Sequence, residues 1–173
     1  MKAVVYYSKY GSTKQYAEWL AEELDADLYT LKEAAKCDFS KYDVVLIGSG
    51  VYAGVLKIRK NLIEMIKNTS DAMIYAFGVG ATPPSEELVN EIANATFKCS
   101  KDKIEKLYVF RGKFDYSALS MEDKLIMGAY KAVVMRKEKL DEAEKAILKC
   151  FEEPESWIDR DSIQCIVNEV KGI

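Results

Sequence analysis

The stretch Tyr6-Tyr7-Ser8-Lys9-Tyr10-Gly11-Ser12-Thr13 decides the fold that this sequence predicts. The apolar run Lys2–Tyr6 is typical of a buried strand, and the apolar spacing of residues 14–24 predicts an amphipathic helix. The start of such a helix has unpaired N–H groups and a positive dipole end, so this hydroxyl-rich loop can hold a phosphate. The alternative interpretation is that Ser12 or Thr13 only caps the helix.

Composition excludes several classes of function. The chain has 173 residues, which fits a single domain over residues 1–173. Its net charge of −3 argues against a nucleic-acid partner. We see neither a signal peptide nor an apolar run of about 18 residues, so we expect no transmembrane segment and a cytoplasmic location. The four cysteines lack C-x-x-C spacing and are expected to be ordinary thiols.

The chain contains no histidine. This absence removes Ser-His-Asp and Cys-His catalysis and argues against a zinc site. We therefore predict no catalytic side chain and no metal ligand. Any chemistry has to come from hydroxyls, carboxylates, Lys, Arg, Tyr or a bound cofactor. The first loop also lacks the lysine of a G-x-x-x-x-G-K-[ST] motif, so a nucleoside triphosphate is not the first ligand to consider.

Strand and helix patterns alternate along the first 110 residues. Short apolar runs predict strands, and longer runs with helical spacing predict helices between them; the strands are 2–6, 27–31, 42–47, 72–77 and 106–110, and the helices 14–24, 56–67 and 85–93. Residues 32–41 are interpreted as a polar connection. This alternation predicts an α/β fold with a parallel sheet covered by helices on both faces.

Two further glycine-bearing loops follow strands, so they fall at the same edge of the sheet as the first loop. The glycines of Gly48–Gly54 let the backbone approach a flat ring, and Tyr52 could stack on it. The loop Gly78–Pro84 offers N–H and C=O groups to the polar edge of a heterocycle. The alternatives are a glycine-rich turn and a stiff strand-to-helix connection. Further candidates at this edge, each also interpretable as a solvated charge, are Arg59, Arg111 and Lys113.

The pattern changes after Arg111. We expect a loop at 112–116, then helices over Met121–Met135, 136–151 and 156–171. The first of these helices has a broad apolar face, which we interpret as core or as a packing surface; it comprises Leu125, Ile126, Ala129, Tyr130, Val133 and Val134. Its basic flank favours an interfacial membrane helix as the alternative; the flank comprises Lys124, Lys131, Arg136, Lys137 and Lys139.

These loops resemble those of a flavodoxin over residues 1–110 and the last helix. Flavodoxins have a phosphate loop of the kind [S/T]-x-[S/T]-G-x-T, which Ser8, Gly11 and Thr13 match and from which Tyr10 departs. The resemblance implies a flavodoxin-like, doubly wound five-stranded parallel sheet of order 2-1-3-4-5, with a helical insertion at about 112–155. It also implies non-covalent binding of FMN by the three loops, through Ser8, Lys9, Tyr10, Gly11, Ser12, Thr13, Ser49, Gly50, Val51, Tyr52, Ala53, Gly54, Gly78, Val79, Gly80 and Ala81.

Within that family, the sequence is most similar to the branch that includes the menaquinone-dependent protoporphyrinogen oxidases. In that branch the second loop runs into a helix, as in residues 48–57. The fifth strand is followed by an aromatic and basic loop and an apolar helix, as in residues 111–116 and 123–127. The resemblance implies an FMN-dependent oxidoreductase as an alternative function, with peripheral contact at the inner face of a membrane.

Our first expectation is an FMN-bearing electron-transfer protein whose partner is a redox protein or a hydrophobic small molecule such as a quinone or porphyrin. One alternative is the protoporphyrinogen oxidase-like enzyme, and another is an interaction module on the same scaffold without flavin. A phospho-acceptor receiver needs acids at the strand ends. The first strand instead ends at Tyr7-Ser8 and the third at Gly48-Ser49, so the receiver is disfavoured.

Overall fold

The computed structural model describes residues 1–58, 60–98 and 101–173. A parallel sheet with the strand order β2-β1-β3-β5-β6 forms its centre. These strands are β1 (Lys2–Tyr7), β2 (Asp27–Thr30), β3 (Val44–Tyr52), β5 (Met73–Gly80) and β6 (Lys106–Arg111). The predicted α/β fold and its order of five parallel strands are therefore confirmed, and all five carboxyl ends meet at one edge.

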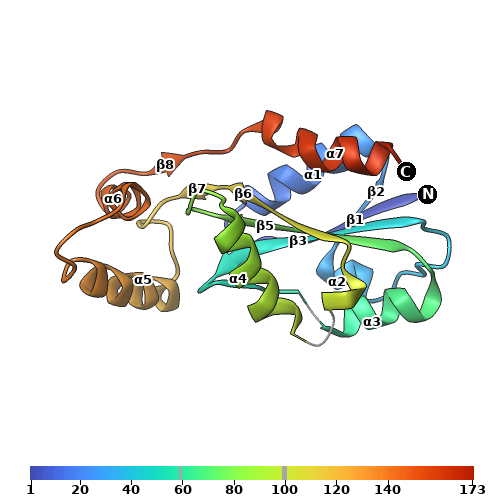
Figure 1. Cartoon of the computed structure of the whole chain (residues 1–173), viewed down its shortest axis with the longest axis horizontal. Coiled ribbons are helices and arrows are strands. Elements are labelled where there is room, and N and C mark those ends of the chain that lie inside the picture. Colours follow the sequence, from blue (N-terminus) through green and yellow to red (C-terminus); the bar gives the residue numbers. More distant parts are fainter. Residues whose placement is uncertain (59, 99–100) are drawn as a thin grey trace.

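Helices cover both faces of this sheet (Figure 1). One face carries α1 (Ser12–Leu24) and α7 (Gln164–Lys171), and the other carries α2 (Leu31–Ala34), α3 (Lys60–Thr69) and α4 (Glu86–Phe97). A short 3₁₀ turn, η1 (Lys101–Lys103), precedes β6. The arrangement explains why β3 is buried from Val44 to Gly50 without alternation: both of its sides meet helices.

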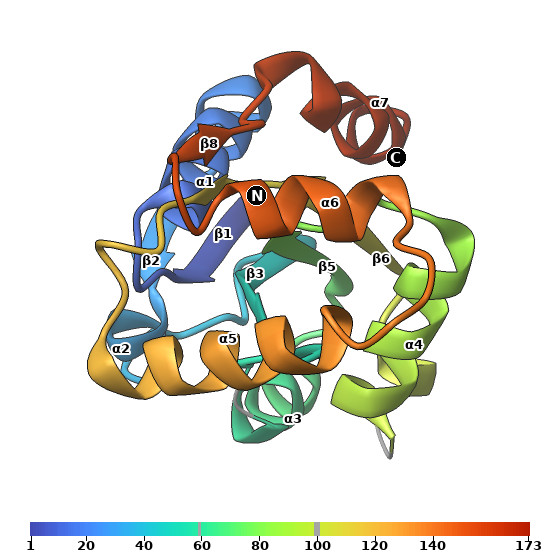
Figure 2. The ribbon, with the colours of Figure 1, turned by 90° about the vertical axis from the view of Figure 1, so that its left-hand side faces the viewer.

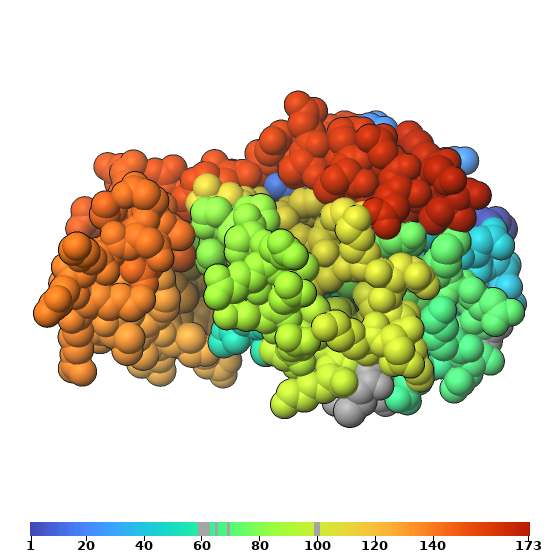
Figure 3. Space-filling view, viewed as in Figure 1, coloured from blue at the N-terminus to red at the C-terminus, as the bar shows by residue number. Residues whose placement is uncertain are grey.

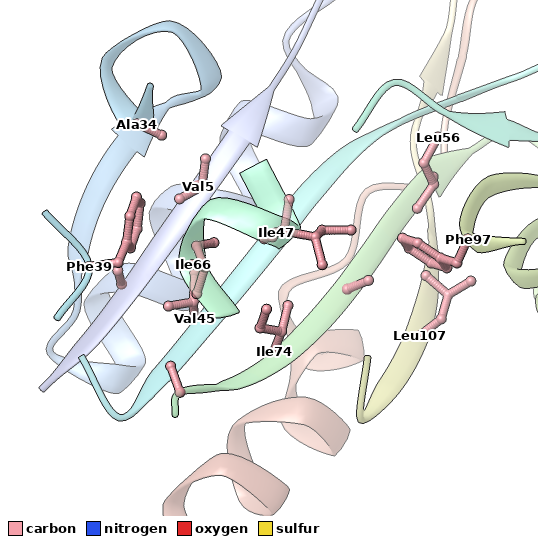
Figure 4. Packing of buried hydrophobic residues seen from close by; sticks show 14 of the residues in the cluster. Val5, Ala34, Phe39, Val45, Ile47, Leu56, Ile66, Ile74, Phe97 and Leu107 are labelled. Atoms are coloured by element: carbon pink, nitrogen blue, oxygen red, sulfur yellow. The ribbon is translucent and has the colours of Figure 1, made fainter. Parts of the chain in front are cut away.

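Each face of the sheet has its own apolar core. Under α1 and α7, side chains including Tyr16, Leu20, Phe77 and Ile166 pack together, and all four are fully buried. On the opposite face, Figure 4 shows Val5, Phe39, Val45, Ile47 and Ile74 packed against residues of α3 and α4, Ile66 and Phe97 among them. These two layers fix the strand ends rigidly, so the loops that follow the strands have a stable base.

The second predicted strand ends one residue early, because Thr30 starts a helix that the sequence analysis missed. The Glu33 N–H donates to Thr30 Oγ1 (3.3 Å), and the Thr30 N–H donates to Glu33 Oε2 (2.8 Å). This reciprocal capping box stabilises α2 within residues that were expected to be a polar connection.

The second predicted loop is largely a strand. β3 continues through Tyr52, and the chain turns only at Ala53 and Gly54 before β4 (Val55–Leu56) pairs antiparallel with β3. The expectation of a loop over Gly48–Gly54 is therefore wrong for its first five residues, and the helix expected from Leu56 begins at Lys60. Gly78 and Gly80 likewise belong to β5. Hydrogen bonding to neighbouring strands extends both elements beyond their apolar runs.

The insertion lies beyond the carboxyl edge of the sheet (Figures 1 and 2). It contains α5 (Met121–Val134) and α6 (Glu142–Lys149), and its ends are joined by the antiparallel pair β7 (Lys113–Phe114) and β8 (Glu155–Ser156). The helix expected over 136–151 begins only at Glu142, where Asp141 and Glu144 form a capping box. The helix expected over 156–171 is also shorter, since η2 (Arg160–Ile163) comes before α7.

The apolar face predicted for α5 does not enter a core. Val134 is buried, but Leu125 is 72% exposed and Val133 is 62% exposed. The core interpretation of this face is therefore wrong for most of its residues, and Figure 3 shows the insertion protruding from the rest of the molecule. Among the described residues, no helix combines the length and apolarity needed to cross a membrane.

Candidate functional site

A cavity of about 330 Å³ opens at the carboxyl edge of the sheet, within the size range of ligand sites. Four segments enclose it: the loop after β1, the ends of β3 and β5, and the insertion. Most of the predicted site residues line it, namely Ser8, Lys9, Tyr10, Ser12, Thr13, Gly50, Val51, Tyr52, Ala53, Val79, Gly80 and Ala81. The fold thus brings all three predicted segments to one cavity.

The remaining predicted residues, Gly11, Ser49, Gly54 and Gly78, are not among those that line the cavity. Ser49 is fully buried; its hydroxyl donates to Gly50 O (2.9 Å) and accepts the Lys57 N–H (2.8 Å). A Cβ on Gly78 would approach Leu56 Cδ2 to 2.9 Å. Ser49 and Gly78 therefore hold the turn after β3 close to the neighbouring strands.

The loop after β1 is built around Gly11, which has a φ of 95° and occupies the N-cap position of α1. No side chain caps this helix, so the alternative that Ser12 or Thr13 is only a cap is wrong. The Gly11 N–H donates to Ser8 Oγ (3.1 Å), and the Lys113 N–H donates to Ser12 Oγ (3.0 Å). Because both hydroxyls accept from the backbone, their own hydrogens can be directed to an acceptor in the cavity.

Thr13 supplies the third hydroxyl of this loop, from the first turn of α1. Its side chain lines the cavity although the residue is only 3% exposed. The first turn also presents backbone N–H groups and the positive end of the helix dipole. This end of the cavity is therefore suited to an anionic group.

Tyr52 forms a second wall at the end of β3. Its ring lies so close to Gly50 that a Cβ there would be 2.8 Å from a ring carbon, and Lys57 Nζ lies 4.5 Å from the ring centroid. Burial raises the pKa of Tyr52 to about 12, so the phenol is neutral at physiological pH. Gly50 is thus needed for the position of Tyr52 as well as for access to the backbone.

Lys9 and Tyr10 point to the start of α5. Lys9 Nζ lies 2.6 Å from Asp123 Oδ2 and 2.9 Å from Ser120 Oγ, while the Ser120 N–H donates to the Tyr10 hydroxyl (3.1 Å), which itself donates to Asp123. The hydrogen bonds from Lys9 and Tyr10 hold the pKa of Asp123 below its usual range. Bonding to Asp123 also raises the pKa of Lys9. The departure from the phosphate motif at Tyr10 therefore serves a contact with the insertion.

The insertion forms the third wall, of which the sequence analysis placed only Lys113 at this edge of the sheet. Apolar side chains dominate it: Phe114, Ala118, Leu119, Ile126 and Met127. In the sequence, only the aromatic and apolar character of residues 111–135 could have indicated this wall. Contacts between residues more than a hundred positions apart produce no local sequence pattern. This wall gives the cavity an apolar side next to the hydroxyl loop, to which the insertion is hydrogen-bonded.

The three basic residues predicted at this edge of the sheet differ in where the structure places them. Lys113 lines the cavity. Arg111 does not: its guanidinium donates twice to Ala81 O (3.0 and 3.1 Å) and lies 4.0 Å from the centroid of the Trp157 ring. Arg59 lies outside the described residues. Within the described ranges, no group of acidic or cysteine side chains is arranged to hold a metal ion.

A family model described as a flavodoxin domain matches residues 3–142. The chain belongs to the flavodoxin-domain family. The matched range includes the five parallel strands of the central sheet, except Lys2 at the start of β1, and the whole of α5. In this flavodoxin-domain protein, the hydroxyl loop, the ends of β3 and β5 and the residues of α5 that line the cavity therefore all lie within the matched range.

The flavodoxin-domain protein is 30% identical over 79 residues to an uncharacterized protein of Methanocaldococcus jannaschii. This match covers 44% of this chain and 51% of that relative. The match thus spans about half the length of the relative. A flavoprotein from Lactobacillus acidophilus NCFM, solved in complex with FMN, is 22% identical and has a TM-score of 0.47, over 64% of this chain and 91% of that one. A flavodoxin from the domain Archaea is 17% identical and has a TM-score of 0.41, and the match covers 88% of this chain and 98% of that flavodoxin.

Proposed function

We propose that this flavodoxin-domain protein binds FMN non-covalently in the cavity and transfers electrons through it. The proposal is supported above all by three segments, each more than 20 residues from the next along the chain, that line a single cavity of about 330 Å³. FMN has a phosphate at one end and a flat ring system at the other. The cavity combines a hydroxyl-rich helix start with apolar walls, which supports this ligand.

The polar end fits the phosphate. Ser8 and Ser12 accept N–H groups from the protein and so keep their hydroxyl hydrogens for a phosphate oxygen. Thr13 adds a third hydroxyl, and the first turn of α1 adds backbone N–H groups. The ring would be held by the strand ends, where Gly50–Ala53 and Val79–Ala81 present backbone groups beside Tyr52.

Bound FMN would supply the redox chemistry that the side chains of this chain lack. The protein's own groups bind and orient the cofactor, and their apolar neighbours exclude water from it. No general acid or base is required for electron transfer, in agreement with a chain that has no histidine. The proposal includes a cytoplasmic location and a redox partner protein that exchanges electrons at this edge.

The first test is a visible absorption spectrum of the purified chain after addition of FMN and removal of the excess. We expect a retained flavin band. A parallel fluorescence titration compares FMN with riboflavin, which has the same ring but no phosphate. Absence of retained flavin would overturn the proposal and favour the interaction module without a cofactor.

The phosphate end is tested with Ser8→Ala and Thr13→Val. Each removes one hydroxyl donor to a charged group, so the FMN dissociation constant should rise about tenfold. The affinity for riboflavin should stay unchanged, because riboflavin has no phosphate. Ser40→Ala, which removes an exposed hydroxyl bound to Asp38, is the matched control. Equal losses for both ligands would contradict the assignment of the phosphate end.

A second candidate function rests on the apolar wall formed by Phe114, Leu119 and Met127. An electron carrier needs a docking surface, whereas an oxidoreductase acting on a hydrophobic molecule needs such a wall. The protoporphyrinogen oxidase-like activity stays a prediction of this kind. It is tested by following oxidation of protoporphyrinogen with a quinone acceptor by the FMN-loaded chain. Turnover that Leu119→Asp abolishes while FMN stays bound would support the enzyme, and absence of turnover would support the carrier.

A further inference from the structure

The outer side of α5 carries an exposed apolar stripe that the proposed cofactor site does not explain. Met121 is 76% exposed, and Leu125, Ile126, Val133 and Met135 are each more than half exposed. Ala129 and Ala132 lie between them at helical spacing and are also exposed. The opposite side of the helix, with Asp123, Met127, Tyr130 and Val134, faces the protein. Exposed apolar patches of this kind mark contact surfaces.

The stripe is complementary to a second copy of itself that runs in the opposite direction. Counting outward from Ala129, Leu125 is matched by Val133, and Ile126 is matched by the small side chain of Ala132. At the two ends, Glu122 is matched by Arg136. An antiparallel pair of such helices would therefore place apolar residues against each other between Leu125 and Val133, with a small residue at the centre for close approach. Opposite charges would meet between Glu122 and Arg136 at each end. Met121 and Met135 lie outside this matched part of the stripe.

We propose that this stripe docks on a second copy of the chain, as an antiparallel pair of α5 helices about a two-fold axis at Ala129. Glu122 and Arg136 are exposed, and neither forms an ion pair within the described part of the chain. Both are thus free to pair between copies. The helix has 14 residues and is about 21 Å long, which accommodates the apolar pairs and Glu122, while Arg136 follows two positions after its last residue, Val134.

The basic residues around α5 favour a second copy over an anionic membrane. Lys124 Nζ donates to Ser117 O (2.9 Å), Lys131 Nζ lies 4.7 Å from the centroid of the Phe151 ring, and Lys137 pairs with Glu144. These three of the five basic residues are engaged within their own chain. Of the other two, Arg136 belongs to the proposed pair, and Lys139 is exposed beyond the end of the helix. A lipid-binding helix needs cations directed outward along its apolar face, and here Glu122 is also on that face.

The proposed contact between two α5 helices adjoins the candidate cofactor site, although dimer formation does not require a bound cofactor. Ile126 belongs to the stripe and also lines the cavity, while remaining 56% exposed. A second copy seated on the stripe would cover this outer edge of the cavity. Each copy would then complete the wall of its partner's site, although the dimer itself requires no FMN.

Sedimentation equilibrium of the full chain, without added flavin, tests the proposal. We expect a reversible dimer whose dissociation constant rises at least tenfold in Leu125→Glu, an exposed position where the change leaves the fold intact. Glu122→Arg and Arg136→Glu should each weaken the dimer, and the double variant should restore it, because the pairs are re-formed with reversed signs. Glu86→Arg, at an exposed position in the first turn of α4, is the matched control.

The position of the axis is tested by cysteine cross-linking. In a Cys165→Ser background, which removes an exposed thiol, Ala129→Cys should form a covalent dimer on mild oxidation. Lys145→Cys, on the exposed side of α6, should not. A monomer at all concentrations would overturn the proposal. So would a dimer that is insensitive to Leu125→Glu, or a monomer that floats with anionic phospholipid vesicles in a Leu125-dependent manner.

Discussion

Gly11 joins β1 to α1 with a φ of 95°, a conformation that costs an L-residue roughly 1–2 kcal/mol. We predict that Gly11→Ala lowers the melting temperature by about 2–8 °C, as expected for a chain of this length. It should also weaken FMN binding, because relief of the strain would move the Ser8 hydroxyl that accepts the Gly11 N–H. Thermal unfolding by circular dichroism and an FMN titration measure the two effects.

Gly128→Ala is the control for this prediction. Gly128 lies within α5, and no atom lies within 4 Å of the Cβ it would gain. Alanine has the higher helix propensity, so this variant should be more stable by about 0.5–1 kcal/mol. If the two glycine variants changed stability in the same direction, the special role of the backbone at Gly11 would be disproved.

At the scale of elements, α5 is held to the hydroxyl loop by Lys9 and Asp123, which lie 2.6 Å apart. We predict that Asp123→Asn speeds hydrogen exchange in α5 by up to about fivefold, within the range of a partly exposed ion pair. Exchange in α4, which has no contact with this pair, should not change. Asp71→Asn, at an exposed position, is the matched control. Unchanged exchange in α5 would show that its apolar contacts alone hold it.

The ion pair between Lys9 and Asp123 stabilises the attachment of α5 only within a defined range of pH. The pKa of Asp123 is lowered, so its contribution is present above the unfolded value of about 3.9 and is lost as the pH falls through the lower folded value. The pKa of Lys9 is raised, so its contribution is present below about 10.4 and is lost at higher pH. An NMR titration of the Asp123 carboxyl group should give a midpoint below 3.9. In Lys9→Met that midpoint should move up.

The strands of the sheet and the helices that cover it were predictable because each has its own local spacing of apolar residues, as in Lys2–Tyr6 and residues 14–24. The strand boundaries were less predictable. The strand β3 extends to Tyr52 because β4 pairs with its last two residues, which the residues of β3 alone do not specify. The apolar period of α5 predicted a helix correctly but could not tell a core face from an exposed one. The bond between Lys9 and Asp123 had no sequence signal, since it depends on how the insertion folds back.

At the scale of the whole molecule, Tyr16 connects three parts of the chain that meet behind the candidate site. It is fully buried in α1; its hydroxyl donates to Arg111 O (2.8 Å) at the end of β6 and accepts the Asp159 N–H (3.0 Å) after β8. Its ring also stacks on Phe110, with centroids 5.0 Å apart. The two hydrogen bonds therefore fix both ends of the insertion relative to α1.

We predict that Tyr16→Phe lowers the free energy of unfolding by about 1–3 kcal/mol, because two backbone groups lose their partner while the ring packing remains. Urea denaturation measures this loss. Tyr6→Phe, at a partly buried position in β1, should stay within about 0.5 kcal/mol of the parent. Since the same bonds position the entry and exit of the insertion, Tyr16→Phe should also weaken FMN binding, whereas Tyr6→Phe should not. A loss of stability with unchanged FMN affinity would mean that the third wall is positioned by β7 and β8 alone.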